Sequence, residues 1–282
     1  MTQAPSLPAP TWFVGCGNMG RAILDGWRAA GIDLSAVVII DPAMPAVESV
    51  RSVATPAEAG PPPKLVILGV KPQMIDEVAG QLRTWLTSKT LIVSLLVGVE
   101  TSSLRQRFPK AAAIVRALPN LPVAVRRGVV ALYSADADEA VRQQIANLFA
   151  PLGFAPWMTE ESKLASVGSV AGAGPAYVAR FIAALAKAGE QRGLSAEIAG
   201  TIALETVLGT AWMAAANGDS MDAIAARVAS PKGTTQAGLA VLDKEQVLDQ
   251  LIALTIEAAA RRGAELAAAA KAPSLAEPAS VH

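Results

Sequence analysis

This sequence has few of the side chains that commonly perform acid–base or redox chemistry: one histidine and one cysteine among 282 residues. The histidine, His282, is the last residue, and Cys16 lies in a glycine-rich turn, where we expect a small turn residue rather than a reactive thiol. A single cysteine excludes an intramolecular disulfide and a cysteine-rich metal site. The sequence therefore predicts a protein that works without a histidine base, a catalytic triad or a metal.

An excess of either charge is also missing, since 24 Lys and Arg side chains balance 24 Asp and Glu side chains. This balance gives no electrostatic reason to expect nucleic acid or an anionic membrane surface as a partner. We expect the longest apolar runs, such as residues 91–99, to be too short to span a bilayer. Residues 1–10 have no basic start and no apolar signal core. We therefore expect a cytoplasmic protein that uses neither nucleic acid nor a membrane.

The most informative stretch that is present is a G-x-G-x-x-G turn over residues 15–20. It follows an apolar run at residues 12–14 and precedes an amphipathic helix, which is the strand–turn–helix context of a dinucleotide site. In such a turn Gly15 allows the sharp bend, Gly17 lets the backbone approach a pyrophosphate, and Gly20 lets the helix pack closely on its strand. The predicted cofactor contacts of the turn are Gly15, Gly17, Asn18, Met19 and Gly20.

A second cofactor contact is expected at Asp41, about twenty residues beyond the turn. Residues 36–40 form a continuous β-branched run that is typical of a buried strand, and Asp41 ends it. A carboxylate at this place would accept hydrogen bonds from the ribose hydroxyls of a dinucleotide. The alternative is an Asp that only starts a turn before Pro42.

The first half of the chain predicts an α/β fold, a Rossmann-type, doubly wound, mostly parallel sheet over residues 11–160. Helices are expected between the strands, at residues 72–86, 102–108 and 136–149. Further strands are expected at residues 64–69, 90–95, 112–116, 128–133 and 154–158. Residues 117–122 place Asn120 between two prolines, which predicts an irregular segment past a strand end, where open α/β sheets bind ligands.

The second half, residues 161–270, shows no convincing strand and predicts an all-α domain. Its helices are apolar over much of their circumference, which favours oligomerisation through this half. Helices are expected at residues 161–191, 195–216, 219–228, from 236 onward, and 244–270. We expect residues 1–10 to be flexible and residues 271–282 to be a disordered tail.

A second constellation lies at residues 230–235, Ser-Pro-Lys-Gly-Thr-Thr. Ser230, Thr234 and Thr235 offer hydroxyls, and Gly233 precedes the positive end of a helix. This combination suits a carboxylate or a small phosphate. The alternative is an ordinary helix cap with a rigid Pro-Gly turn.

Four stretches give the chain a resemblance to the pyrroline-5-carboxylate reductase family. They are residues 15–20, residues 70–72 (Val-Lys-Pro), residues 116–122 (Arg-Ala-Leu-Pro-Asn-Leu-Pro), and the pair 171–177 with 230–235. They follow the family's order and spacing and cover roughly residues 11–268. The last pair is the most specific part, because many dinucleotide-binding enzymes share the first stretch.

The resemblance implies a nicotinamide-binding Rossmann domain and a helical dimerisation domain, and so a homodimer or a larger oligomer. It implies hydride transfer to the C=N carbon of 1-pyrroline-5-carboxylate, the last step of proline biosynthesis. Residues implied on the nicotinamide side are Val70, Lys71, Pro72 and Asn120. Residues implied to hold the substrate are Gly174, Pro175, Ser230, Gly233, Thr234 and Thr235, and Thr235 would also assist protonation of the imine nitrogen as the catalytic residue.

Three departures from the family's pattern affect these expectations. Ala171 and Ala173 stand where the family usually has Ser, and Lys232 replaces a usual Gly, where it would either add a charge to the anion site or point to solvent. Asp41 is followed by Pro-Ala-Met, with no cation close behind it in the sequence. At this place the family often has Ser or Asn with Arg or Thr close behind, and those residues suit the 2′-phosphate of NADPH. Because a carboxylate repels that phosphate, we predict NADH or NADPH as the cofactor with a preference for NADH.

Two alternatives remain beside this interpretation: a reductase of a different imino acid, and a non-catalytic dinucleotide-binding protein on the same scaffold. A β-hydroxyacid dehydrogenase of similar architecture would need a lysine soon after the interdomain glycines as a proton donor. Residues 175–186 contain Arg180 but no lysine. This absence argues against that reaction.

Overall fold

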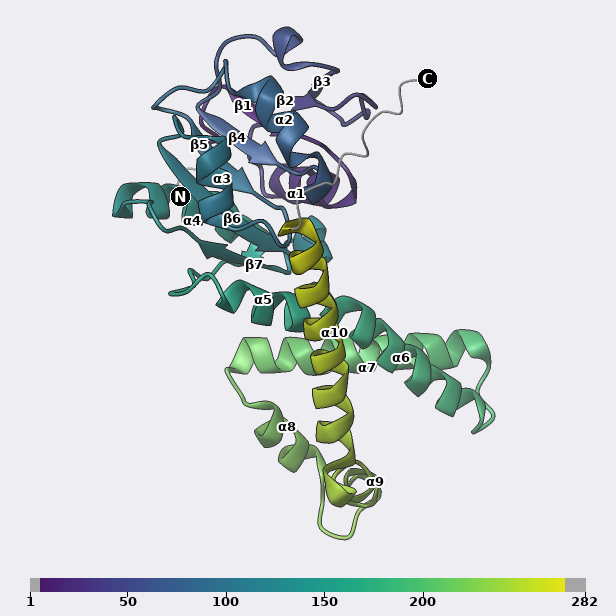
Figure 1. Ribbon diagram of the computed structural model, residues 1–282. Helices are drawn as coiled ribbons and strands as arrows, with labels where there is room; N and C mark the ends of the chain where they lie inside the picture. Colours follow the sequence, from purple (N-terminus) through teal and green to yellow (C-terminus); the bar gives the residue numbers. More distant parts are fainter. Residues whose placement is uncertain (1–5, 272–282) are drawn as a thin grey trace, which may run out of the picture. The chain divides into compact units, whose positions relative to one another are not determined.

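The computed structural model describes residues 6–271 and divides into two compact units (Figure 1). One unit contains the chain up to Ala173 together with residues from Ala259 onward, and the other spans Gly174–Ala258. Of the flexible N-terminus expected at residues 1–10 and the disordered tail expected at residues 271–282, residues 1–5 and 272–282 lie outside the described residues. Leu7 is buried, and Lys271 is the last residue of a helix.

The first unit is built on an eight-stranded sheet with the order β3-β2-β1-β4-β5-β6-β7-β8. All neighbouring strands are parallel except β6 and β7, which are antiparallel. The strands are β1 Thr11–Val14, β2 Val37–Ile40, β3 Arg51–Val53, β4 Leu65–Leu68, β5 Leu91–Ser94, β6 Ala113–Pro119, β7 Gly128–Tyr133 and β8 Gly153–Phe154. The predicted doubly wound α/β sheet is confirmed, and its strand order reverses at β1, where such folds bind ligands.

Helices cover both faces of this sheet (Figure 1). α1 (Asn18–Ala29) and α4 (Glu139–Phe149) pack in one core, whereas α2 (Ile75–Leu82) and α3 (Thr101–Arg107) pack in the other. Consecutive residues of β1 enter opposite cores, Phe13 the first and Trp12 the second, because side chains alternate along a strand. Burial on both faces explains why the strands read as continuous apolar runs rather than alternating ones.

Two predicted strand boundaries in this unit are wrong. β6 continues through residues 117–119, where an irregular segment was expected, because β7 returns beside it and Pro119 pairs with Val130. Proline has no backbone N–H to donate to a neighbouring strand. The strand tolerates Pro119 because β5 pairs with β6 only as far as Arg116, so no β5 residue lies opposite Pro119. The strand predicted at residues 154–158 is shorter: β8 covers Gly153–Phe154, and a single bridge joins Trp157 to Leu132.

The second half of the chain is helical, as predicted, and has no strand between residues 161 and 271. Its helices are α5 Lys163–Val167, a π-helical segment Gly168–Gly172, α6 Gly174–Glu190, α7 Ala196–Asn217, α8 Met221–Val228, α9 Thr234–Leu242 and α10 Val247–Lys271. Ser195 caps α7 by accepting a hydrogen bond from the Ile198 N–H, and Gly218 ends it in the left-handed conformation with φ of 72°. α9 begins at Thr234 rather than near residue 236.

The helical half exposes many large apolar side chains within the single chain. Two helical segments, Lys163–Glu190 and Ala196–Asn217, are long and apolar enough to cross a membrane by length and composition, so the expectation that no segment is long enough is wrong. This is weak evidence for a membrane, because the core helix of a soluble protein can pass the same test. Exposed apolar residues on α6 and α7 include Val178, Phe181, Leu185, Ile198, Ile202, Leu204, Leu208 and Trp212.

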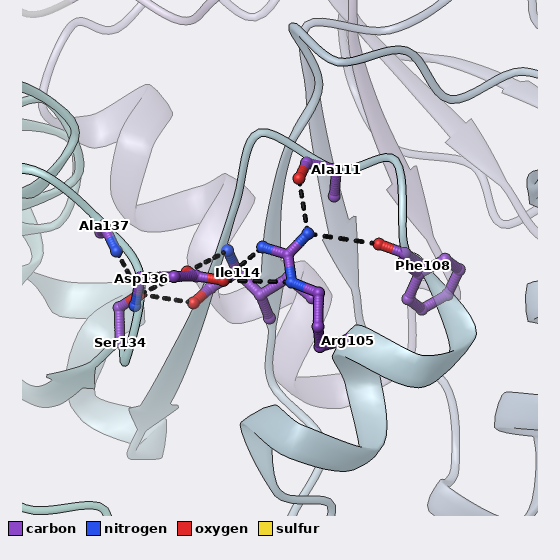
Figure 2. A network of polar contacts seen from close by, with 7 residues as sticks. All are labelled: Arg105, Phe108, Ala111, Ile114, Ser134, Asp136 and Ala137. Atoms are coloured by element: carbon purple, nitrogen blue, oxygen red, sulfur yellow. Dashed lines mark hydrogen bonds and ion pairs between the residues drawn. The ribbon is translucent and has the colours of Figure 1, made fainter.

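A polar network in the first unit joins the end of α3 to the start of β6 and to the β7–α4 connection (Figure 2). Asp136 accepts hydrogen bonds from the Ile114 backbone N–H at 3.0 Å and from Arg105, whose Nε lies 3.1 Å away. Arg105 also donates to the Ala111 carbonyl at 2.6 Å. Burial of the Asp136 carboxyl acts to raise its pKa, but the hydrogen bonds from Ile114 and Arg105 outweigh it and lower the pKa.

We expect Asp136→Ala to lower the free energy of unfolding by about 1–3 kcal/mol at pH 7, because the buried Ile114 N–H loses its acceptor. Since folding lowers the pKa of Asp136, its contribution is present above the unfolded-state pKa and is lost as the pH falls through the folded-state pKa. Urea unfolding of the wild type and the variant between pH 3 and pH 7 measures this difference. Asp76→Ala is the control, because the Asp76 side chain is 76% exposed and pairs with Arg107 at the surface. Equal losses in both variants at pH 7 would contradict the role given to the network.

Candidate active site

The glycine turn lies between β1 and α1 and has the geometry that a dinucleotide site requires. Gly15 has φ of +79°, and a Cβ there would lie 2.6 Å from Val70 Cγ1. A Cβ at Gly20 would lie 2.9 Å from Phe13 Cε1, so this glycine permits the close contact between helix and strand. A Cβ at Gly17 would meet no protein atom within 4 Å. Two of the three glycines are therefore needed by the protein itself, while Gly17 leaves open space.

The open space at Gly17 coincides with the start of α1. Gly17 is the N-cap residue of this helix and provides no side-chain cap, and Asn18 and Met19 form the first turn. The N–H groups and the positive end of a helix bind phosphate groups. The open space at Gly17 and the uncapped start of α1 therefore suit the pyrophosphate of a dinucleotide.

Asp41 lies beside this turn, because β1 and β2 are parallel neighbours with Val14 opposite Ile40. Its Oδ2 accepts a hydrogen bond from the Cys16 backbone N–H at 2.9 Å, and its Oδ1 accepts one from the Ala43 N–H at 2.9 Å. A carboxylate has about four lone-pair sites. The two backbone hydrogen bonds hold Asp41 beside the turn and leave lone pairs on its carboxylate that can accept hydrogen bonds from hydroxyl groups.

The Cys16 thiol in the same turn is buried and free. Burial, followed by the Asp41 carboxylate, raises the pKa of this thiol to about 11, while the Arg21 guanidinium acts to lower it. The thiol is therefore protonated at neutral pH and is a weak nucleophile.

Residues 70–72, predicted on the nicotinamide side, follow β4 and contact the glycine turn. The Gly69 N–H donates to the Val14 carbonyl at 2.8 Å, and the Val70 backbone lies against Gly15. Lys71 is extended, with φ of −66° and ψ of 142°, and Pro72 starts a short 3-10 helix. The structure thus brings residues 70–72, the glycine turn and Asp41 together at the carboxyl ends of three adjacent strands.

Asn120 has a structural role that the sequence did not reveal. It is 7% exposed, its Nδ2 donates to the Ala171 carbonyl at 3.0 Å, and its Oδ1 accepts from the Val129 N–H at 2.8 Å. Its side chain therefore joins the end of β6 to β7 and to the π-helical segment Gly168–Gly172. Segments of π-helix are rare in proteins, and those that occur are often found at functional sites.

A partly buried ion pair that involves Arg116 of β6 was also missed. Glu161 Oε1 lies 2.9 Å from Arg116 Nη1 and accepts a hydrogen bond from the Thr101 backbone N–H at 2.7 Å. Burial acts to raise the pKa of Glu161, but the Thr101 N–H and the Arg116 guanidinium outweigh it and lower the pKa. The partners are 45 and 60 residues apart in sequence, and no local pattern links them.

The sequence shows no cation close behind Asp41, and the structure brings one from another element to the segment that follows Asp41. Arg21, on the first turns of α1, donates a hydrogen bond from Nη2 to the Ala46 carbonyl at 2.8 Å. Ala46 lies in the connection that follows Asp41. Short stretches of sequence could not reveal this, because helix packing on the sheet brings the two segments together.

In the second unit, the loop at residues 230–233 places a hydroxyl at the start of α9. The Gly233 N–H donates to the Ser230 carbonyl at 3.0 Å, and a Cβ at Gly233 would lie 2.3 Å from Ser230 Oγ. Gly233 is the N-cap of α9 and supplies no side-chain cap, while Thr234 and Thr235 are the first two helical residues. Three hydroxyls therefore lie within one turn of an open helix N-terminus, which is the arrangement predicted for an anion site.

Lys232 adopts the left-handed conformation, with φ of +60°, and its N–H donates to Gln236 Oε1 at 2.6 Å. This conformation costs a non-glycine residue roughly 1–2 kcal/mol. Gly174 and Pro175, the other predicted substrate residues, form the start of α6, and a Cβ at Gly174 would meet no atom within 4 Å.

Each half of the chain matches a known protein family. Residues 161–266 match a family described as pyrroline-5-carboxylate reductase dimerisation. Residues 12–98 match a family described as NADP oxidoreductase, coenzyme F420-dependent. The first match covers the helical half, and the second covers the glycine turn, Asp41 and residues 70–72.

Individual relatives cover most of the chain. The pyrroline-5-carboxylate reductase of Pseudomonas aeruginosa is 33% identical over 262 residues, which are 90% of this chain and 96% of the relative. That of Synechocystis is 36% identical over 212 residues, which are 74% of this chain and 77% of the relative. Among solved structures, a pyrroline-5-carboxylate reductase from Coxiella burnetii is similar with a TM-score of 0.83 and 30% identity, covering 92% of this chain and 99% of that one.

Proposed function

Because this chain belongs to the pyrroline-5-carboxylate reductase family, we propose that its glycine turn binds a nicotinamide cofactor and that the loop at residues 230–235 holds the substrate carboxylate. The reaction is the reduction of 1-pyrroline-5-carboxylate to proline. The bound cofactor supplies a hydride from nicotinamide C4 to the C=N carbon, and the imine nitrogen takes up a proton. The observation that supports the substrate site best is the uncapped start of α9 with Ser230, Thr234 and Thr235 around it.

This chemistry agrees with the near absence of histidine. A cyclic imine that is protonated before or during hydride transfer is already electrophilic, so the enzyme needs to hold two partners in a reactive geometry more than it needs a strong acid. We assign Ser230, Gly233 and Thr234 to the substrate carboxylate, and Gly174 and Pro175 to close backbone approach to the substrate. Thr235 Oγ1 is assigned to hydrogen bonding at the imine nitrogen, where it assists protonation.

The helical half, residues 161–270, is proposed to form a homodimer, or a larger assembly built from it. The exposed apolar side chains of α6 and α7 lie within the segment matched by the dimerisation family. Burial between two chains would remove this apolar surface from water. We accordingly propose a cytoplasmic enzyme in which the two long apolar helices face a second copy of the chain instead of lipid.

We propose that the enzyme prefers NADH, with Asp41 as the reason. Replacing Asp41 by Ser is expected to raise the ratio of kcat/KM for NADPH to kcat/KM for NADH by about 10- to 100-fold, because the carboxylate that repels the 2′-phosphate is removed. Initial rates with each cofactor at saturating substrate measure the ratio. Asp41→Asn is the matched variant, since it keeps the shape and removes the charge. A wild-type preference for NADPH would contradict the role given to Asp41.

The experiment that tests the function is an initial-rate assay with 1-pyrroline-5-carboxylate, run in parallel with NADH and NADPH. Oxidation of either cofactor with stoichiometric formation of proline is the expected result. Absence of any rate would overturn the assignment. Turnover of a six-membered cyclic imino acid in its place would indicate that Ala171, Ala173 and Lys232 change which substrate the enzyme accepts. Binding of the cofactor without turnover of either substrate would indicate a non-catalytic protein.

A further inference from the structure

Arg21 lies next to the expected adenosine end of the cofactor site and has no role in the function described so far. It follows the glycine turn directly, its side chain is exposed, and its guanidinium donates to the Ala46 carbonyl at 2.8 Å. Ala46 is five residues beyond Asp41, in the connection between β2 and β3. The Arg21 side chain therefore extends from α1 to the segment that follows the carboxyl end of β2, where Rossmann folds place the adenosine ribose.

Among residues 6–271, no carboxylate forms an ion pair with Arg21 within 4.0 Å. Its hydrogen-bond partner is a neutral carbonyl. Arg28, seven residues along the same helix, instead forms ion pairs with Asp25 and Glu48 at 2.5 and 3.3 Å. Arg28 thus joins α1 to the β2–β3 connection through an ion pair with Glu48. The Arg21 guanidinium makes its contact with a neutral carbonyl, so it can form an ion pair with an anion that binds there.

Arg21 and Asp41 both act on the glycine turn. Asp41 accepts a hydrogen bond from the Cys16 N–H, and the two residues shift the pKa of the Cys16 thiol in opposite directions. Carboxylates at this end of a Rossmann site accept ribose hydroxyls, and arginines nearby accommodate a 2′-phosphate. This site therefore holds one group suited to each form of the cofactor.

We propose that Arg21 is a specificity-determining residue that binds the 2′-phosphate of NADPH, releasing the Ala46 carbonyl to do so, while Asp41 opposes it. The exchange is favourable because a guanidinium–phosphate hydrogen bond is charge-assisted and stronger than one to a neutral carbonyl. Of these two side chains, both contribute to the affinity for NADPH, whereas only Asp41 contributes to the affinity for NADH. This inference rests on the proposed cofactor site and not on the identity of the substrate.

The test is fluorescence titration of NADPH and NADH into the full-length protein without substrate, for the wild type, Arg21→Ala, Asp41→Ser and the double variant. Arg21→Ala is expected to raise the Kd for NADPH by about 10- to 100-fold in the Asp41→Ser background, through loss of a charge-assisted hydrogen bond. It is expected to change the Kd for NADH less than about 2-fold, because NADH has no 2′-phosphate for that bond. Arg28→Ala is the control, because it removes another contact between α1 and the same connection, the ion pair with Glu48, and it should leave both Kd values unchanged.

Equal weakening of both cofactors by Arg21→Ala would overturn the proposal, because a residue that only fastens the connection to α1 would affect both. No weakening of NADPH in the Asp41→Ser background would overturn it as well. The assay needs no turnover, so the expected pattern in a protein that fails to reduce 1-pyrroline-5-carboxylate would support Arg21 while refuting the substrate assignment. Unchanged thermal melting of Arg21→Ala confirms that the variant is folded.

Discussion

Replacing Gly17 by alanine is expected to weaken cofactor binding by about 100-fold, or roughly 2.8 kcal/mol, while the protein stays folded. The new methyl group would meet no protein atom within 4 Å, so nothing in the protein opposes it. It would occupy the space through which the backbone approaches the pyrophosphate. Gly17 has φ of −75°, which alanine adopts freely, and the change at the helix N-cap costs about 1 kcal/mol. Titration with NADH and NADPH, together with thermal melting, measures both effects.

Gly15→Ala is the informative comparison, because the two glycines lie in one turn and do different things. Gly15 has φ of +79°, and its Cβ would lie 2.6 Å from Val70 Cγ1 and 2.9 Å from the Val70 backbone nitrogen. We expect this variant to lose stability as well as cofactor binding. If Gly17→Ala melted at a temperature as low as Gly15→Ala, the assignment of Gly17 to ligand approach would be wrong.

Replacing Thr235 by valine is expected to lower kcat by about 100-fold, the lower end of what a positioned proton donor contributes. Valine keeps the shape of threonine and removes the hydroxyl that we assign to the imine nitrogen. The affinity for NADH should stay within about 2-fold of the wild type, because Thr235 is assigned to the substrate and not to the cofactor. Steady-state kinetics with 1-pyrroline-5-carboxylate and a cofactor titration measure the two quantities separately.

Two further variants separate catalysis from carboxylate binding at this helix end. Thr234→Val removes a neighbouring hydroxyl from the same turn and is expected mainly to raise the KM for 1-pyrroline-5-carboxylate. Thr235→Ser restores a hydroxyl and should recover most of the lost kcat. An equal fall of kcat in Thr234→Val and Thr235→Val would show that Thr235 has no special part in proton transfer.

Much of the fold could be predicted because its determinants are local. Continuous β-branched runs predicted the parallel strands, and Asn217-Gly218 predicted the end of α7, where Gly218 adopts the left-handed conformation. The start of α9 was predicted two residues late, because Thr is favoured at the N-cap and has a low helix propensity, whereas Thr234 and Thr235 lie inside the helix and Gly233 is its N-cap. The extension of β6 through Pro119 was missed because it depends on β7 and not on residues 117–119 themselves.

By itself, the sequence predicted the class of chemistry and the segments that would carry it. One cysteine and a terminal histidine argued against a histidine base, the resemblance to the reductase family implied hydride transfer, and the glycine turn and the hydroxyl-rich loop were the two predicted binding segments. These features are recognisable because each depends on the conformation of a few consecutive residues. The same reasoning explains why Gly15 and Gly20 were assigned correctly to the turn and to close helix packing.

Only the tertiary structure decided which side chains meet across the sheet. Three contacts join residues between 25 and 51 positions apart: the hydrogen bond from the Asn120 amide to the Ala171 carbonyl, the partly buried Arg116–Glu161 ion pair, and the hydrogen bond from Arg21 to the Ala46 carbonyl. Such pairs leave no periodic signal, because parallel strands separated by helices bring distant strand ends to one edge. The charge balance at the proposed ribose site, and with it the proposed choice between NADH and NADPH, depends on that long-range packing.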